Sequence, residues 1–101
     1  WEISVDGNVQ GVAVTGSELV AGGHFDNVCD PGTNCQNEFV RHKVLAADVS
    51  TGALDTGWHP SVNSSLGVFG VAATSSKVMI GGDFTKAGGL DQAHYAQFSV
   101  S

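Results

Sequence analysis

The sequence predicts an all-β fold made of two copies of one small antiparallel unit. Fourteen glycines and two prolines, with Val, Thr and Ser throughout, suit short strands joined by tight turns. Residues 9–25 and 68–84 match without a gap at nine of seventeen positions, which indicates one supersecondary unit used twice at a spacing of 59 residues. With 42% hydrophobic and 14% charged residues, the 101-residue chain can bury a core.

The first copy follows an outer segment at residues 1–6, which we assign to a preceding unit. Its third strand is expected from about Lys43 to Val49, after the two strands of the matched block. Thr51-Gly52 then make a turn, and residues 53–58 are expected to form a fourth, outer strand.

The second copy has the clearer strand pattern. Residues 68–74 and 78–82 are runs of small and β-branched residues separated by a Thr-Ser-Ser-Lys turn, which is typical of a hairpin. A third strand is expected over residues 93–100, where Tyr95 and Phe98 are the large apolar positions. Each unit is then a sheet of about 45 to 60 residues, the size of a propeller blade.

A glycine pair followed closely by Phe recurs in V-A-G-G-H-F at 20–25 and M-I-G-G-D-F at 79–84. Glycine weakens a strand, so a repeated pair needs a structural reason. We interpret the pairs as places where the strand bends or a neighbouring backbone approaches closely, and the Phe residues as fillers between sheets. The pairs therefore mark a position in a repeated unit rather than an active site.

The first copy carries about eight more residues than the second between its glycine pair and its third strand. The excess falls in the stretch F-D-N-V-C-D-P-G-T-N-C-Q-N-E-F. We therefore expect residues 1–57 to hold the outer strand of a preceding blade and the first blade, with a cysteine-loop insertion at about 26–41. Residues 58–101 are expected to form the second blade.

These residues resemble a known repeat family. Val71-Ala72, the segment I-G-G-D-F at 80–84 and the segment D-V-S-T-G-A-L-D-T-G-W-H-P at 48–60 are similar to the delta-sixty family of β-propeller repeats of secreted and cell-surface proteins. The resemblance covers nearly the whole chain outside the cysteine insertion. It implies two β-propeller blades of a larger closed propeller, located outside the cell or on its surface.

Two blades leave a propeller incomplete, because closed propellers generally have four to eight blades. The expected partners are therefore other blades, either in the same polypeptide, of which this chain is then a fragment, or in an oligomer of two-blade chains. We favour the first reading. A protein or glycan ligand is a further possible partner.

Ten acidic against four basic residues give a formal charge of −6. Nucleic acid and anionic membrane surfaces are therefore poor partners. No run approaches the roughly 18 apolar residues that a membrane helix needs, so membrane insertion is not expected.

The two cysteines, Cys29 and Cys35, flank Asp-Pro-Gly-Thr-Asn, a turn sequence that could bring them within disulfide reach. Such a bridge would restrain a loop without a core of its own and would fit an oxidising compartment. A zinc site from these cysteines with His24 and His42 is the rival reading, but the cysteine spacing is longer than usual. The disulfide is the prediction.

Candidate ligand residues lie in the loops after the glycine pairs and at the repeated Trp. They are His24, Asp26, Asp83, Trp58 and His59. Calcium would find oxygen ligands at Asp26, Asp30, Asp83 and Asp91, yet no calcium-loop motif is present, so neither a metal nor another cofactor is expected. Trp58 can serve as a sugar platform, although its recurrence as Trp1 favours packing between blades.

Catalytic motifs are missing from the sequence, including the nucleophile elbow and phosphate-binding loops. We therefore predict an extracellular or cell-surface propeller module for binding or structural display, without catalysis of its own. A carbohydrate-binding lectin assembled from two-blade subunits and a fragment of a larger propeller enzyme are the alternatives, because one fold hosts many functions.

Overall fold

The computed structural model describes residues 3–29, 38–63, 67–91 and 93–99 of the chain. Every element in this part of the chain is a strand, which confirms the predicted all-β class. No helix long and apolar enough to cross a membrane occurs in these ranges. The strands are β1 (Ser4–Val5), β2 (Asn8–Thr15), β3 (Glu18–His24), β4 (Asn27–Cys29), β5 (Glu38–Val40), β6 (Val44–Asp48), β7 (Gly67–Ala73), β8 (Lys77–Asp83), β9 (Lys86–Ala87), β10 (Leu90–Asp91) and β11 (Tyr95–Ser99).

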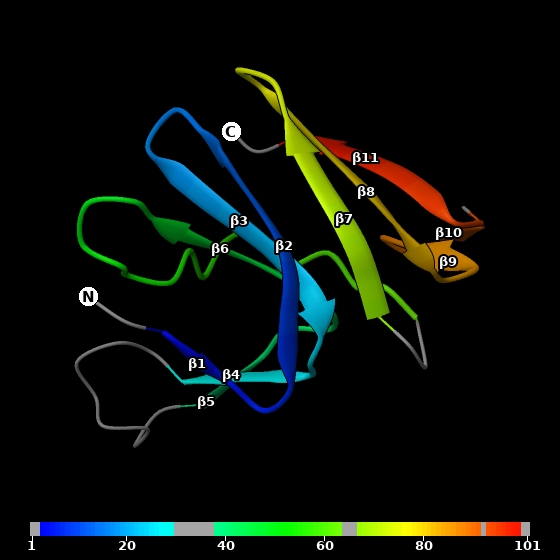
Figure 1. The fold of residues 1–101 in the computed structure, drawn as a ribbon, viewed down its shortest axis with the longest axis horizontal. Coiled ribbons are helices and arrows are strands. Elements are labelled where there is room, and N and C mark those ends of the chain that lie inside the picture. Colours follow the sequence, from blue (N-terminus) through cyan, green and yellow to red (C-terminus); the bar gives the residue numbers. More distant parts are fainter. Residues whose placement is uncertain (1–2, 30–37, 64–66, 92, 100–101) are drawn as a thin grey trace.

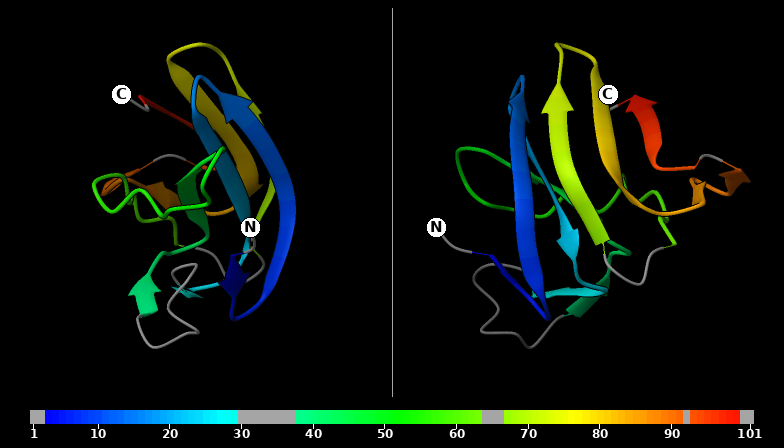
Figure 2. Two further views of the ribbon diagram at one scale, coloured as in Figure 1. Left: turned by 90° about the vertical axis from the view of Figure 1, so that its left-hand side faces the viewer. Right: turned by 45° about the vertical axis from the view of Figure 1, so that its right-hand side comes forward.

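Two three-stranded antiparallel sheets form the body of the molecule. The first has the order β2-β3-β6 and the second the order β7-β8-β11. The sheets lie side by side with β2 next to β7, as Figures 1 and 2 show. The described strands do not close into a ring.

The two sheets repeat each other in register as well as in order. A bulge between Val9 and Gly11 in β2 recurs between Val68 and Gly70 in β7. The residue before the third strand has a positive φ in both copies, 76° at Lys43 and 66° at His94. This conformation is uncommon for residues other than glycine. Its recurrence indicates that the backbone enters the third strand with the same geometry in both copies.

Each copy also carries a small hairpin. β4 pairs with β5 and with β1, while β9 pairs with β10 and Val62 bridges to Ala87. Since β1 pairs with β4, residues 4–5 join the first copy. The second hairpin turns at Gly88-Gly89, both with positive φ.

The cysteine stretch, expected as a loop at about 26–41, therefore begins and ends in paired strands. Residues 27–29 and 38–40 are β4 and β5. The eight extra residues, 30–37, lie outside the described part of the chain. The insertion therefore falls between two paired strands, β4 and β5, whose counterparts in the second copy are β9 and β10.

The expected fourth strand at residues 53–58 is reduced to a short pairing at residues 53–55. Leu54 bridges to Ala47, and the backbone N–H groups of Asp48 and Asp55 donate to Ala53 O and Ala46 O at 2.8 Å each. The chain then turns, because Asp55 Oδ1 accepts from the backbone N–H of Gly57 at 3.0 Å. Short side chains that bind nearby N–H groups compete with strand pairing in this way.

One mode of packing joins the two sheets. The second sheet applies its valine face to the glycine face of the first sheet, where both faces bury their side chains in one cluster. We define the valine face by Val68, Val71 and Ala73 in the second copy and by Val9, Val12 and Val14 in the first. We define the glycine face by Gly11, Val20, Gly22, Val44 and Ala46 in the first copy and by Gly70, Met79, Gly81, Tyr95 and Gln97 in the second.

The first glycine of the pair is needed for this packing. A Cβ on Gly22 would lie 2.6 Å from Val68 Cγ1 and 2.9 Å from Val71 Cγ2, closer than van der Waals contact allows. The equivalent Gly81 faces open space, with His94 O at 3.7 Å as the nearest atom. Glycine at position 22 therefore admits the side chains of the neighbouring sheet. The expected close approach of a backbone occurs instead at Gly23, where a Cβ would lie 2.0 Å from Asn8 O.

No second sheet in the described part of the chain covers the equivalent faces at the two ends. Val12, on the valine face of the first sheet, is 57% exposed. Tyr95, on the glycine face of the second sheet, is 54% exposed, whereas its counterpart Val44 is completely buried. The molecule thus presents one open valine face and one open glycine face.

Candidate functional site

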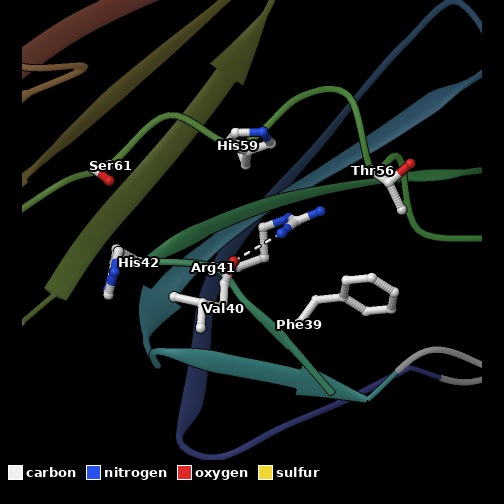
Figure 3. Close-up of a pocket in the computed structure, with 7 residues that line it drawn as sticks. All are labelled: Phe39, Val40, Arg41, His42, Thr56, His59 and Ser61. Carbon is white, nitrogen blue, oxygen red and sulfur yellow. Dashed lines mark hydrogen bonds between the residues drawn. The ribbon is translucent and has the colours of Figure 1, made fainter. Parts of the chain in front are cut away.

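A polar hollow lies where residues 39–43 face residues 56–63. It consists of two adjoining depressions of about 430 and 410 Å³ that share His42 and Ser61. Figure 3 shows the larger one, with Arg41 and Phe39 on one side and Thr56, His59 and Ser61 on the other. The lining of both together defines the polar hollow: Asp26, Phe39, Val40, Arg41, His42, Lys43, Thr56, His59, Ser61, Val62 and Asn63.

The turn that leads into β6 builds one wall. The backbone N–H of Lys43 donates to Phe25 O at 2.9 Å, and that of Arg41 donates to Asp26 O at 2.8 Å. Lys43 O in turn accepts from the N–H of Gly23 at 3.0 Å. These bonds hold three consecutive residues that can carry positive charge, 41–43, at the rim of the first sheet.

Asp26 neutralises part of this wall. Its Oδ1 accepts from Lys43 Nζ at 2.7 Å and lies 3.2 Å from His42 Nδ1. The Lys43 ammonium, followed by His42, holds the pKa of Asp26 below its ordinary value. The Lys43 side chain is therefore buried with its charge paired.

The Arg41 guanidinium bonds to backbone carbonyls rather than to a carboxylate, although the residue is only 6% exposed. Nη1 donates to Val40 O at 2.7 Å and Nη2 reaches Asp55 O at 3.4 Å, while Nε has no hydrogen-bond partner in the described part of the chain. The Phe39 ring lies 5.6 Å from the guanidinium carbon. Burial lowers the pKa of Arg41, which the nearby Asp55 charge partly offsets.

Ser61, His42 and Asp26 share the smaller depression, so a catalytic triad has to be considered. Within the described residues the Ser61 hydroxyl makes no hydrogen bond to His42, whose ring nitrogen instead contacts Asp26. The Asp26 side chain is half exposed, and its Oδ1 is shared with Lys43. This arrangement pairs the Asp26 carboxylate with Lys43 and His42 and does not position His42 to activate the Ser61 hydroxyl.

Two of the predicted ligand residues, Asp26 and His59, line the polar hollow. His24 and Asp83 end β3 and β8 and line neither depression. Trp58 packs in the second copy, where Nε1 donates to Ser99 O at 2.8 Å and the ring meets Phe98 edge to face at 6.1 Å. Trp58 therefore has a packing role.

The cysteine predictions depend on residues outside the described part of the chain. Cys29 ends β4, but Cys35 lies in the range 30–37, so the predicted disulfide stays a prediction. The rival zinc set includes Cys35 and the calcium set includes Asp30. Among the described residues, no three His, Cys, Asp or Glu side chains gather as a metal site would require.

Sequence reasoning missed Arg41, Lys43, Thr56 and Ser61 as lining residues. Two of the four basic residues, Arg41 and Lys43, flank His42 in an otherwise acidic chain. That run was a usable signal. Thr56 and Ser61 carry no local pattern, because they reach the hollow only through the course of the chain after β6.

Comparison of the chain with protein-family models, curated proteins and solved structures gives no match. The resemblance to delta-sixty repeats and the domain division at residue 57 therefore stay predictions. What the molecule does has to be argued from its own faces and from the polar hollow.

Proposed function

We propose that this chain is a non-catalytic module of a β-propeller that serves binding or structural display outside the cell or on its surface. In this proposal, further units of the same kind dock on its two open faces. They belong either to the same polypeptide or to other copies of the chain. The polar hollow is the surface on which such a module would bind a ligand.

The observation that carries the proposal is the complementarity of the two open faces. Inside the chain, a valine face already seats on a glycine face through Gly22, Val68 and Val71. The open valine face and the open glycine face form the same kind of complementary pair, and neither is covered by a sheet of the described chain. A contact of this kind runs head to tail, and head-to-tail contacts generate rings when the rotation closes.

The extracellular part of the proposal is supported by the cysteine pair predicted to form a disulfide, which would persist in an oxidising compartment. The non-catalytic part is supported by the geometry around Ser61, His42 and Asp26, where one carboxylate oxygen serves both Lys43 and His42.

Sedimentation of the purified chain over a wide concentration range tests docking. The wild-type chain is expected to form larger species as concentration rises. Val12→Asp places a charge on the open valine face, and Gly81→Val fills the open glycine face. Each is expected to leave the chain monomeric, because a buried unpaired charge and a steric clash both oppose seating.

Mixing the two variants gives the decisive readout. Each retains the face that the other has lost, so a one-to-one mixture is expected to form a dimer and nothing larger. Ser75→Asp, in the exposed β7–β8 turn, adds the same charge away from both faces and should associate like wild type. A wild-type chain that stays monomeric throughout, or a mixture without a dimer, contradicts docking.

A further inference from the structure

The two buried cations in the wall of the polar hollow differ in the partners of their charged groups. Lys43 has Asp26 at 2.7 Å, whereas Arg41 donates only to two backbone carbonyls and makes no ion pair within 4.0 Å in the described part of the chain. Burying a charge without a partner is costly, and proteins rarely keep such an arrangement without a use for it. The Asp55 charge acts on Arg41 without such a contact. Arg41 lines the larger depression, so a ligand there can supply an anion in direct contact.

The arrangement belongs to the first copy alone. By the register of the two copies, Phe39 and His42 correspond to Leu90 and Ala93, and Arg41 corresponds to Gln92. The packing of the repeat therefore does not require a cation or an aromatic ring at these positions. Residue types that occur at these positions in only one of the two copies are candidates for a specific role.

The opposite side of the depression is rich in uncommitted polar groups. The side chains of Thr56, His59 and Ser61 make no hydrogen bond to any described residue, and all three residues are exposed. Figure 3 shows His59 above Arg41, across the opening from Phe39 and Val40. The depression thus combines one cation, an apolar side and a side of hydroxyl and imidazole groups.

We propose that the polar hollow binds the carboxylate of an acidic sugar, with Arg41 as the cation that meets the carboxylate. A guanidinium is the side chain best suited to a carboxylate, because its planar array of donors matches two oxygens. Thr56, His59 and Ser61 bond the sugar hydroxyls, and Phe39 with Val40 lies against the apolar side of the ring. The volume of about 430 Å³ falls in the range of small-ligand sites.

This proposal rests on the binding role proposed above, but it does not need further units to dock. The titration therefore uses both the wild-type chain and the Val12→Asp variant, in which the polar hollow is intact. Loss of association in sedimentation and loss of ligand binding in titration are separate results, so failure of one proposal is not mistaken for failure of the other.

Calorimetric titration with a galacturonate trisaccharide is the test. Binding is expected for this probe and not for the neutral galactose trisaccharide of the same length. His59→Ala, at an exposed position where folding is not at risk, is expected to weaken binding about tenfold, the effect of one lost hydrogen bond to the ligand. Arg41→Lys keeps the charge but loses the planar donors, and is also expected to weaken binding about tenfold.

His24→Ala is the matched control, since His24 is an exposed histidine that lines neither depression. Its affinity should equal that of the wild type. Absence of galacturonate binding, equal binding of the neutral sugar, or unchanged affinity in both hollow variants overturns the proposal. Binding of a triglutamate peptide in place of the sugar would replace the saccharide assignment with a peptide one.

Discussion

At the scale of single residues, one position shows how the two copies solve the same problem with different chemistry. Asp6 Oδ1 accepts from the backbone N–H groups of residues 26–27 at 2.9 and 3.0 Å. Asn63 Oδ1 accepts from residues 85–86 in the same way, at 3.0 and 2.6 Å. The shared requirement is an acceptor that ties the start of each copy to its small hairpin, and either a carboxylate or an amide meets it.

The carboxylate makes the first of these ties sensitive to acid. Backbone N–H groups and the Asn27 side chain hold the pKa of Asp6 down, at about 2. A lowered pKa contributes stability that is present above the ordinary value of about 3.9 and is lost as pH falls toward 2. Asp6→Asn should therefore lessen the fall in unfolding free energy between about pH 4 and pH 2.

Chemical denaturation of the wild type, Asp6→Asn and Asp6→Ala across this range measures the effect. At neutral pH, Asp6→Asn should stay near the wild type, as Asn63 does its work in the second copy, whereas Asp6→Ala should be less stable. Equal stability of the alanine variant at neutral pH would show that the tie contributes nothing.

Glu18 is the opposite case. Its Oε2 is buried without a hydrogen-bond partner in the described part of the chain. Burial raises the pKa of Glu18, and the neighbouring carboxyl groups of Asp55 and Asp48 raise it further. The folded chain then holds this proton more tightly than the unfolded chain does, so stability falls as pH rises through the window between the two pKa values.

Glu18→Gln should remove this slope and raise the unfolding free energy at pH 7 by about 0.5 kcal/mol, the size of a partly exposed charge interaction. The comparison is denaturant unfolding at pH 4 and pH 7. Asp91→Asn changes the net charge equally at an exposed site and should leave the slope unchanged. A slope that survives in Glu18→Gln would assign it to another group.

At the scale of elements, the two glycines of the pair in β3 and β8 have different roles. The first concerns packing between the copies, and the second concerns the local course of the backbone. The second glycine lies against its own first strand, since a Cβ on Gly23 would meet Asn8 O at 2.0 Å and one on Gly82 would meet Gly67 O at 2.5 Å. Gly23 N–H donates to Lys43 O and Gly82 N–H to His94 O in the same way. The first glycine, by contrast, is needed only where another sheet covers it.

This difference predicts unequal costs for the same substitution. Gly22→Ala should destabilise the chain by about 1 to 3 kcal/mol, as overpacking in a filled interface does. Gly81→Ala, where a Cβ has room, should be neutral or stabilising by up to about 1 kcal/mol, because alanine restricts the unfolded chain. Denaturant unfolding in dilute solution, where copies do not meet, compares the two.

Equal losses in the two alanine variants would contradict the asymmetry of the faces. Gly23→Ala and Gly82→Ala provide the internal reference, since both should destabilise the chain through contact with backbone oxygens.

At the scale of the whole molecule, the core is not divided evenly between the copies. One buried cluster joins the first sheet to the second, from Val20 and Val44 to Val68 and Ile80, and the other lies around Phe25 and Leu45 within the first copy. The second copy thus completes its core with side chains of the first. Repeated units that bury their faces only against neighbours are stable as an array. The open faces are the surfaces on which the proposed further units would dock.

Much of this fold was open to prediction from sequence. The matched block at a spacing of 59 residues located β7 and β8 and, by equivalence, β2 and β3. The third strands at 44–48 and 95–99 followed from apolar patterns. The outer strand expected at 53–58 stops at residue 55, because Asp55 binds the N–H of Gly57 and turns the chain, and that competition depends on a side chain rather than on periodicity.

The candidate site was less accessible to prediction. Asp26 and His59 were chosen from the sequence and line the hollow, but His24, Asp83 and Trp58 were chosen on the same grounds and do not. Repeat position alone cannot tell them apart. Which polar side chains share a surface depends on the turns at residues 41–43 and 50–58.

The sequence by itself determined the repeated unit, its glycine pairs and the all-β class, because strand periodicity and turn residues act over a few positions of the chain. Only the tertiary structure decided that Gly22 admits a neighbouring sheet while Gly81 is left open, and that Arg41 is buried beside His59 without an ion partner among the described residues. Both are contacts between segments far apart in the chain, and their energies depend on burial and distance, which no local pattern encodes.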